Sequence, residues 1–238
     1  MKIALVGYGK MGKEIETIAI EKGHEIVLKI LIDNTEDLTK VNLQLADVAI
    51  EFTGPESAVE NIKKCIDAGV PVISGSTGWL SQWKEVEEYC TSNLGALIYA
   101  SNFSIGVNLF FELNKYLAEM MANYPSYNVE LKEVHHTQKL DSPSGTAITL
   151  AQQVMEKITG KKQWVNTPSK SEEDLVITSD RIDPAPGTHH IKYSSVIDEI
   201  EIIHTAHNRT GFATGAITAA EFLVGKKGIY NMKDVLGL

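Results

Sequence analysis

The residues best suited to chemistry lie between Glu133 and Ala147, where the chain reads Glu-Val-His-His-Thr-Gln-Lys-Leu-Asp-Ser-Pro-Ser-Gly-Thr-Ala. An imidazole exchanges a proton near neutral pH, so this pair of adjacent histidines offers a general acid or base. Adjacent residues on a strand point to opposite faces, so only one of the two should face a given pocket, and the spacing leaves open which. Candidate proton-transfer and charge-bearing residues are therefore His135, His136 and Lys139.

The Pro-Ser-Gly-Thr run that follows has the composition of a helix start. The amides of Ser144, Gly145 and Thr146 should be unpaired donors at the positive end of a helix, which is a binding site for a carboxylate. Lys139 would add a positive charge beside them. The segment thus predicts that a small anion is bound where a proton is transferred.

A second motif is the glycine-rich turn Gly7-Tyr8-Gly9-Lys10-Met11-Gly12, which follows a strand and opens a helix. In that context the spacing is typical of a turn that binds the pyrophosphate of a dinucleotide. Asp33 follows the second strand, where a carboxylate can bind ribose hydroxyls and disfavour a 2′-phosphate. Two alternatives stay open: Asp33 is a plain loop residue, or Lys29 accepts a phosphate.

Three further loops should reach the same edge of a parallel sheet, because they follow successive strands. They begin at Phe52, Gly75 and Ala100, and their small and hydroxyl residues would let the backbone approach a nicotinamide ribose. The alternative is that they only form turns.

The elements around these motifs change in character near residue 106. Before it, continuous apolar runs at 3–6, 26–32, 48–52, 70–73 and 96–99 alternate with helical patterns at 11–22, 56–68 and 82–92. That alternation predicts an α/β domain, a Rossmann-type doubly wound parallel sheet with Gly23 and Gly69 ending two helices.

After residue 106 we expect a smaller α+β domain with a mixed or antiparallel sheet. Helices are expected at 107–122 and from Thr146 to Gly160, and strands at 129–134, 175–182, 189–196 and 199–206, with a polar loop at 161–174. A last helix is expected at 212–224.

Composition excludes several classes of protein. A formal net charge of -9 without a basic stripe disfavours nucleic-acid binding. The apolar runs are too short to cross a bilayer and no signal sequence is recognised, so we expect a cytoplasmic protein. Cys65 and Cys90 should be buried free thiols, no metal site is expected, and Ser144 lacks the G-x-S-x-G elbow of a hydrolase nucleophile.

The segment from Glu133 to Ala147 closely resembles the signature of the dihydrodipicolinate (4-hydroxy-tetrahydrodipicolinate) reductase family of diaminopimelate and lysine synthesis. The resemblance continues through residues 7–12, 51–53, 75–78, 101–108 and 207–216, so it spans nearly the whole chain. Two departures are Ser142, where the family usually has alanine, and a glycine turn one residue shorter than the longer family form.

The resemblance implies an NADH- or NADPH-dependent oxidoreductase that acts on a small anionic dicarboxylate. It implies a dinucleotide-binding domain at 1–105 and 211–238, and a domain at 106–210 for substrate binding, catalysis and assembly into a homotetramer. It also implies that the domains close on the ligand. Its catalytic residues would be His135 and Lys139, and its substrate would be bound by His136, Ser144, Gly145, Thr146 and Arg209. The cofactor contacts would be Gly7, Tyr8, Gly9, Lys10, Met11, Gly12, Asp33, Phe52, Gly75, Ser76, Thr77, Ala100, Ser101, Asn102 and Phe103.

Two other functions share these motifs. One is a regulatory protein that senses a nicotinamide cofactor without turnover, and the other is a related two-domain dehydrogenase acting on an amino acid or a semialdehyde.

Overall fold

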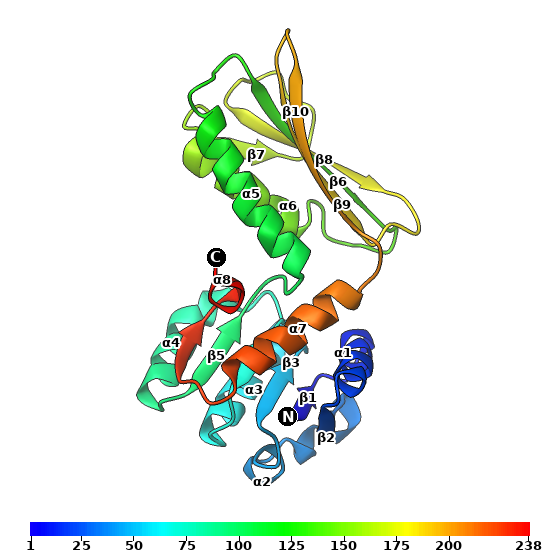
Figure 1. The fold of residues 1–238 in the computed structure, drawn as a ribbon, viewed down its shortest axis with the longest axis vertical. Coiled ribbons are helices and arrows are strands. Elements are labelled where there is room, and N and C mark those ends of the chain that lie inside the picture. The colour runs from blue at the N-terminus through cyan, green and yellow to red at the C-terminus, as the bar shows by residue number, and fades with distance from the viewer. The chain divides into compact units, whose positions relative to one another are not determined.

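The computed structural model describes residues 1–238 and divides them into two compact units. The first unit combines Met1–Ile105 with Thr210–Leu238, and the second is Gly106–Arg209. Figure 1 shows the C-terminal segment, coloured orange to red, returning to the elements of the N-terminal part.

The first unit is built on a parallel sheet of six strands in the order β11-β5-β4-β3-β1-β2. The strands are β1 (Lys2–Val6), β2 (Glu25–Ile30), β3 (Val48–Glu51), β4 (Val72–Ser74), β5 (Ala96–Tyr99) and β11 (Gly228–Tyr230). All the paired neighbours run parallel, so the carboxyl ends of the strands share one edge. The predicted doubly wound parallel sheet is confirmed.

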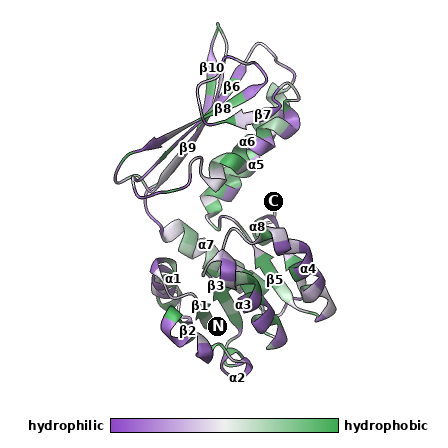
Figure 2. Cartoon of the chain, turned by 180° about the vertical axis from the view of Figure 1, so that it is seen from behind, coloured by the Kyte–Doolittle hydropathy of each residue, from purple (hydrophilic) through white to green (hydrophobic).

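Successive side chains of these strands enter two separate hydrophobic cores. In β1, Ile3 and Leu5 join one core, whereas Ala4 and Val6 join the other. A strand that is apolar at every position satisfies both faces at once, which is why the sequence shows continuous runs. Figure 2 shows strands β1, β3 and β5 in green, at the hydrophobic end of the scale, with purple on the helices around them.

Helices cover both faces of this sheet. One core contains residues of α1 (Lys10–Glu21), α7 (Thr210–Leu223) and α8 (Met232–Leu236). The other contains residues of α2 (Lys40–Leu43), α3 (Pro55–Asp67) and α4 (Trp83–Ser92). Gly23 and Gly69 follow α1 and α3 with positive φ, as predicted for helix ends.

The second unit places two helices on one face of a mixed sheet in the order β10-β9-β6-β8-β7. Its helices are α5 (Ile105–Met121) and α6 (Gly145–Lys157). Its strands are β6 (Asn128–His135), β7 (Gln163–Val165), β8 (Asp174–Arg181), β9 (Gly187–Ser194) and β10 (Glu199–Ala206). β6 and β7 run parallel to β8, whereas β9 is antiparallel to β6 and β10.

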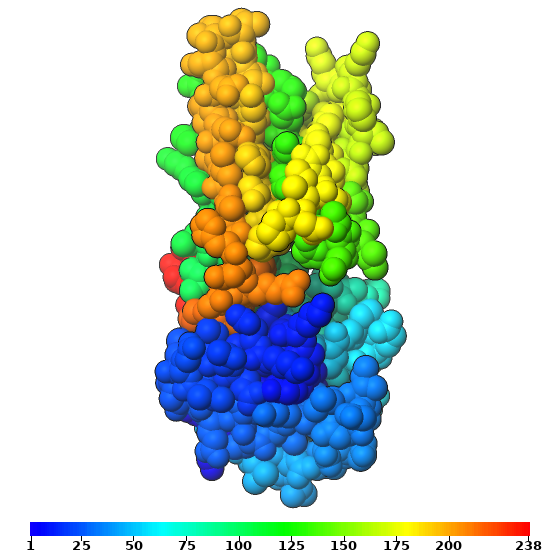
Figure 3. Space-filling model, turned by 90° about the vertical axis from the view of Figure 1, so that its right-hand side faces the viewer, coloured from blue at the N-terminus to red at the C-terminus, as the bar shows by residue number.

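The opposite face of the second sheet is polar and open. It carries the ion pairs Lys132–Asp180, His190–Glu201 and Lys192–Glu199, at 2.9, 2.8 and 2.5 Å. Figure 3 shows β10, in orange, along its length at the surface.

Several details differ from the expectations. The segment 161–174 contains β7, which is three residues long, and β11 and α8 carry too short a pattern to be recognised. Ile32, expected in a strand, lies in a 3₁₀ helix that spans Ile32–Asp37. α6 ends at Lys157, capped by Ile158 rather than by Gly160.

Two expectations on single elements are confirmed. Cys65 and Cys90 are buried free thiols in α3 and α4. Every helix is too short or too polar to cross a membrane.

Candidate active site

The glycine turn in the first unit owes its shape to close backbone approaches. Gly7 has a φ of +98°, and a Cβ there would lie 2.1 Å from the carbonyl oxygen of Phe52. A Cβ at Gly12 would lie 2.6 Å from the carbonyl oxygen of Gly7. Both positions therefore require glycine for the fold, before any ligand is considered.

Gly9 has a different reason to lack a side chain. It precedes the first residue of α1, and a Cβ there would have no neighbour within 4 Å. The open space lies at the start of a twelve-residue helix, where backbone amides and the helix dipole favour a phosphate. Lys10, Met11 and Gly12 form the first turn of this helix.

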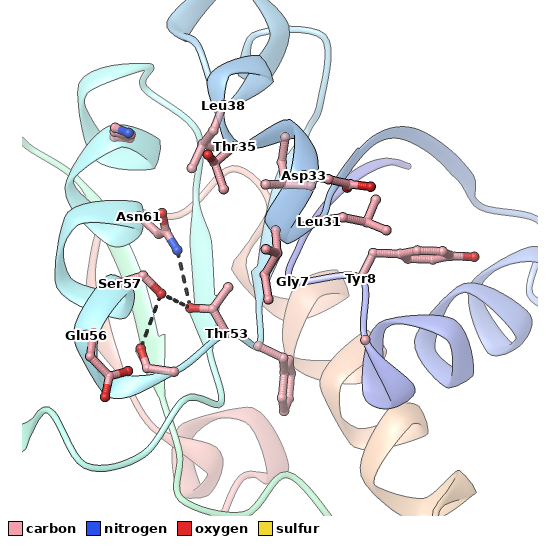
Figure 4. A pocket seen from close by; sticks show the side chains of 16 residues that line it. Gly7, Tyr8, Leu31, Asp33, Thr35, Leu38, Thr53, Glu56, Ser57 and Asn61 are labelled. Atoms are coloured by element: carbon pink, nitrogen blue, oxygen red, sulfur yellow. Dashed lines mark hydrogen bonds between the residues drawn. The ribbon is translucent and has the colours of Figure 1, made fainter.

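A pocket of about 740 Å³ lies beside this turn. It is lined by Gly7, Tyr8, Gly9, Asp33 and Phe52, among others (Figure 4). Among the other lining residues, Ser57 and Asn61 donate hydrogen bonds to the Thr53 hydroxyl, at 3.0 and 3.3 Å. The open glycine, the helix start and the exposed Asp33 carboxylate together fit the phosphate and ribose of a dinucleotide.

Lys29, the alternative phosphate ligand, is already paired. Its Nζ atom lies 2.6 Å from Glu16 Oε1 and 4.8 Å from the ring centre of Tyr8, whose hydroxyl also donates to Glu16. Lys29 does not line the pocket, whereas Asp33 does.

Glu51 organises two of the other loops at this edge of the sheet. Its fully buried carboxylate accepts hydrogen bonds from Ser74 and Ser76 at 2.5 and 2.7 Å, and from the Thr53 amide at 2.9 Å. Gly75 precedes Ser76 and passes the Phe52 ring so closely that a Cβ would lie 2.2 Å from it. Thr77, the next residue, is exposed.

The loop after β5 contributes less side-chain surface than expected. Phe103 is 2% exposed and belongs to the hydrophobic core, so its ring packs inside the unit. Ala100, Ser101 and Asn102 lie in the loop itself, and Asn102 accepts a hydrogen bond from the Ser104 amide at 2.9 Å.

In the second unit, the end of β6 places Glu133 and His135 on the buried face. Glu133 is fully buried, and Oε1 accepts hydrogen bonds from Ser179 at 2.8 Å and from Arg181 at 3.3 Å. Burial alone would raise the pKa of Glu133, but the hydrogen bonds from Ser144 and Ser179 and the charge of His135 lower it overall. Glu133 is therefore an ionised carboxylate in the interior.

His135 lies beside this carboxylate and is 7% exposed. Its Nδ1 atom makes no hydrogen bond, but it lies 3.4 Å from Glu133 Oε2. Burial lowers the pKa of His135, the Glu133 charge opposes that shift, and Lys139 and Arg181 reinforce it. Because its pKa is lowered, the protonated imidazole of His135 releases its proton readily.

His189 on β9 completes the cluster. Its ring packs edge-on against that of His135 at 5.1 Å, and its Nε2 atom lies 3.3 Å from the Ser144 hydroxyl. Burial lowers the pKa of His189 to about 3, so this ring is neutral. Glu133, His135 and His189 have ligand atoms within 4.8 Å of one another, as a metal site would. Since both Glu133 oxygens already accept hydrogen bonds, we interpret the cluster as a polar network.

The amide of Ser144 corrects one expectation. It is not an unpaired donor, because it donates to both oxygens of Glu133 at 3.1 and 3.2 Å. The Ser144 hydroxyl caps α6 by accepting from the Ala147 amide at 3.2 Å. Gly145 and Thr146 follow in the first turn, where the helix dipole favours an anion.

Lys139 lies in the loop that joins β6 to α6. Its Nζ atom is 2.9 Å from Asp141, whose backbone carbonyl accepts a hydrogen bond from Arg181 at 2.6 Å. Lys139 and Arg181 thus bring positive charge to the same loop.

Two other expected substrate-binding residues lie just after β6 and at the boundary of the second unit. His136 follows the last residue of β6, and its carbonyl accepts the Lys139 amide at 3.2 Å. Arg209 is exposed and is the last residue of the second unit.

The sequence also contained a signal for Glu133, which was not among the expected site residues. Residues two apart on a strand share a face, so Glu133 and His135 had to lie side by side. Ser179, Arg181 and His189 had no comparable signal, because pairing of β6 with β8 and β9 brings them in.

A dinucleotide-binding sheet joined to a unit with buried proton-transfer groups defines a two-unit oxidoreductase. Comparison with known proteins specifies the family. The family model "Dihydrodipicolinate reductase, N-terminus" matches residues 1–103, and "Dihydrodipicolinate reductase, C-terminus" matches residues 106–236. The chain belongs to the dihydrodipicolinate reductase family, as the sequence predicted.

Relatives of this chain match it over nearly its full length. A Christiangramia forsetii protein named 4-hydroxy-tetrahydrodipicolinate reductase is 50% identical over 99% of this chain and 98% of its own. A Methanosarcina mazei protein of the same name is 35% identical over 99% of this chain and 89% of its own. A dipicolinate-bound dihydrodipicolinate reductase from Paenisporosarcina sp. TG-14 shares the fold, with a TM-score of 0.77, 24% identity and 97% coverage of both chains. This reductase family and nucleotide-binding fold imply a nicotinamide cofactor.

Proposed function

We propose that this chain reduces 4-hydroxy-tetrahydrodipicolinate to tetrahydrodipicolinate in diaminopimelate and lysine synthesis. The substrate gains a hydride and a proton and loses its hydroxyl as water. The relatives named above carry this activity in their names, and both family models cover the chain almost completely.

The observation that carries the proposal is the position of His135 in the second unit. Its imidazole lies beside both the ionised Glu133 and the neutral His189, on the strand that leads to Lys139 and to the start of α6. This arrangement supports proton donation by His135 to the substrate ring, with Lys139 as a second donor and electrostatic partner. The first turn of α6, at Gly145 and Thr146, supports binding of a substrate carboxylate, with His136 and Arg209 as further candidates.

When bound, NADH or NADPH supplies the hydride. The Gly7–Gly12 turn, Asp33 and the loops at Phe52, Gly75–Thr77 and Ala100–Asn102 would hold it, and Phe103 would support them from the core. The reaction requires the nicotinamide bound by the first unit to meet the proton donors of the second.

The position of Asp33 supports NADH as the preferred cofactor. Its carboxylate lines the pocket, where it would repel a 2′-phosphate, and Lys29 is paired with Glu16. We expect Asp33→Ala to raise the NADPH/NADH ratio of kcat/KM roughly tenfold, which corresponds to about 1.4 kcal/mol. Glu36→Ala is the matched control, because Glu36 is exposed on the same 3₁₀ segment and does not line the pocket. An unchanged ratio in Asp33→Ala would remove Asp33 from cofactor selection.

The test of the function is oxidation of NADH and of NADPH with freshly generated substrate. Turnover with kcat/KM well above that for amino acids and semialdehydes is the expected result. Cofactor binding without turnover would favour a sensor, and turnover only with the other substrates would favour a related dehydrogenase.

Two further properties follow from the family resemblance. We propose a homotetramer, which the open face of the second sheet supports: Ile203 is 51% exposed there. Light scattering of the purified chain tests it, and a monomeric mass would contradict it. A cytoplasmic location stays a prediction.

A further inference from the structure

We propose that Glu133 is a positioning residue for the reduction, holding the His135 imidazole and the start of α6 in a fixed relation to each other. The inference deepens the proposed function and rests on it. Glu133 itself is fully buried and acts through its neighbours.

The carboxylate of Glu133 contacts two different parts of the candidate site. Oε2 lies 3.4 Å from Nδ1 of His135, and both oxygens accept the Ser144 amide, at 3.1 and 3.2 Å. Ser144 is the N-cap of α6, the helix whose first turn would bind a substrate carboxylate. One side chain therefore joins the proton donor to the anion-binding element.

The carboxylate is also fixed in place from the neighbouring strand. Ser179 and Arg181 of β8 donate to Oε1 at 2.8 and 3.3 Å. Asn166 donates to the Ser179 hydroxyl at 3.0 Å, and Ser142 donates to Asn166 at 3.0 Å. A buried carboxylate costs stability unless it is hydrogen-bonded, and this one accepts hydrogen bonds from three residues, Ser144, Ser179 and Arg181.

The negative charge determines which nitrogen of His135 carries the proton. A carboxylate beside Nδ1 favours a proton there, so Nε2 becomes the atom that gains and loses the mobile proton. Gly187 packs beside that atom, and any larger residue there would crowd it, since a Cβ would lie 3.0 Å from Nε2. Glu133 thus directs the reactive nitrogen away from itself.

Other charges also act on His135. Lys139 and Asp141 face it from the loop after β6, and Arg181 faces it from β8. His189, on β9, also faces it but is neutral. Glu133 has a larger charge effect on His135 than any of these groups, and it favours the protonated form. Its removal should therefore lower the pKa of His135.

The experiment compares Glu133→Gln with Glu130→Gln, its matched control on the exposed face of β6. We expect Glu133→Gln to lower kcat roughly tenfold or more with a smaller change in KM, as for loss of oriented acid–base help. The activity of a general acid falls as pH rises through its pKa, so this fall should occur about one pH unit lower in Glu133→Gln. Glu133→Asp keeps the charge and should restore part of the kcat and of the pH profile.

A second readout needs no turnover. In ¹⁵N-labelled protein, the His135 imidazole should show a proton on Nδ1 in the wild type and titrate at lower pH in Glu133→Gln, with Glu130→Gln unchanged. A wild-type proton on Nε2, or an unchanged His135 titration in a folded Glu133→Gln, would overturn the proposal. If the wild type fails to reduce the substrate, the proposed function fails while the titration still decides the role of Glu133.

Discussion

At the residue scale, the behaviour of His135 follows from two opposing effects. Burial lowers its pKa, and the adjacent Glu133 carboxylate raises it. The imidazole is thereby left as a proton donor that gives up its proton easily, beside an ionised partner that stabilises the protonated form. Neither effect alone would suit a group that must both hold and release a proton near neutral pH.

Substitution of His135 tests its role directly. We expect His135→Gln to lower kcat by roughly 10²-fold or more, because general acid–base help contributes about that much, while the substrate still binds. The measurement is steady-state kinetics together with direct substrate binding. An unchanged kcat would remove His135 from the mechanism.

Lys139 should affect both binding and rate. A charged partner of a carboxylate contributes on the order of 1.5–3 kcal/mol, so Lys139→Ala should lower kcat/KM by about 10- to 100-fold. Lys132→Ala is the control, because Lys132 pairs with Asp180 on the open face of the same sheet. Equal kinetics for the two variants would contradict the assignment.

The sequence predicted some site residues better than others. His135, Lys139 and the start of α6 stand close together in the chain, so local pattern was enough to select them. The Ser144 amide was expected to be unpaired, but it donates a hydrogen bond to Glu133, which lies two residues before His135 on β6. This contact joins β6 to the N-cap of α6 through the tertiary fold, which local pattern does not define.

At the scale of elements, the long apolar runs of the first unit were predictable because they satisfy two cores at once. The short strands β7 and β11 were not, since each holds only two consecutive apolar residues. Their positions depend on pairing with β8 and β5.

The glycine turn allows two of its positions to be separated by experiment. Gly7→Ala should destabilise the first unit by a few kcal/mol, because its Cβ would meet the Phe52 carbonyl and its φ is positive. Gly9→Ala should unfold like the wild type, because its Cβ would have open space around it. The same Cβ would occupy the space expected for the phosphate, so dinucleotide binding should weaken. Thermal unfolding and cofactor titration check both; equal loss of stability would contradict the distinction.

At the scale of the whole molecule, His189 links stability to pH. Its pKa is lowered from 6.5 to about 3, mainly by burial, so between these values the unfolded chain binds a proton that the folded chain does not. Its contribution is fully present above about pH 6.5 and is lost as the pH falls toward 3. The free energy of unfolding should therefore fall over this range.

Denaturant unfolding at several pH values measures this dependence. His189→Gln should unfold with a shallower pH dependence than the wild type, and His207→Gln, at an exposed position, should not. The same slope in all three proteins would contradict the role of His189.

The first unit is assembled from both ends of the chain, which has a consequence for synthesis. Helix α7 fills one core with Ala213, Ala216, Ile217 and Ala220, and β11 supplies an edge strand. A nascent polypeptide that has emerged only to residue 105 exposes the apolar face that α7 later covers. During translation the cofactor-binding half is therefore begun first and finished last, so its apolar face stays uncovered until α7 and β11 have been synthesised.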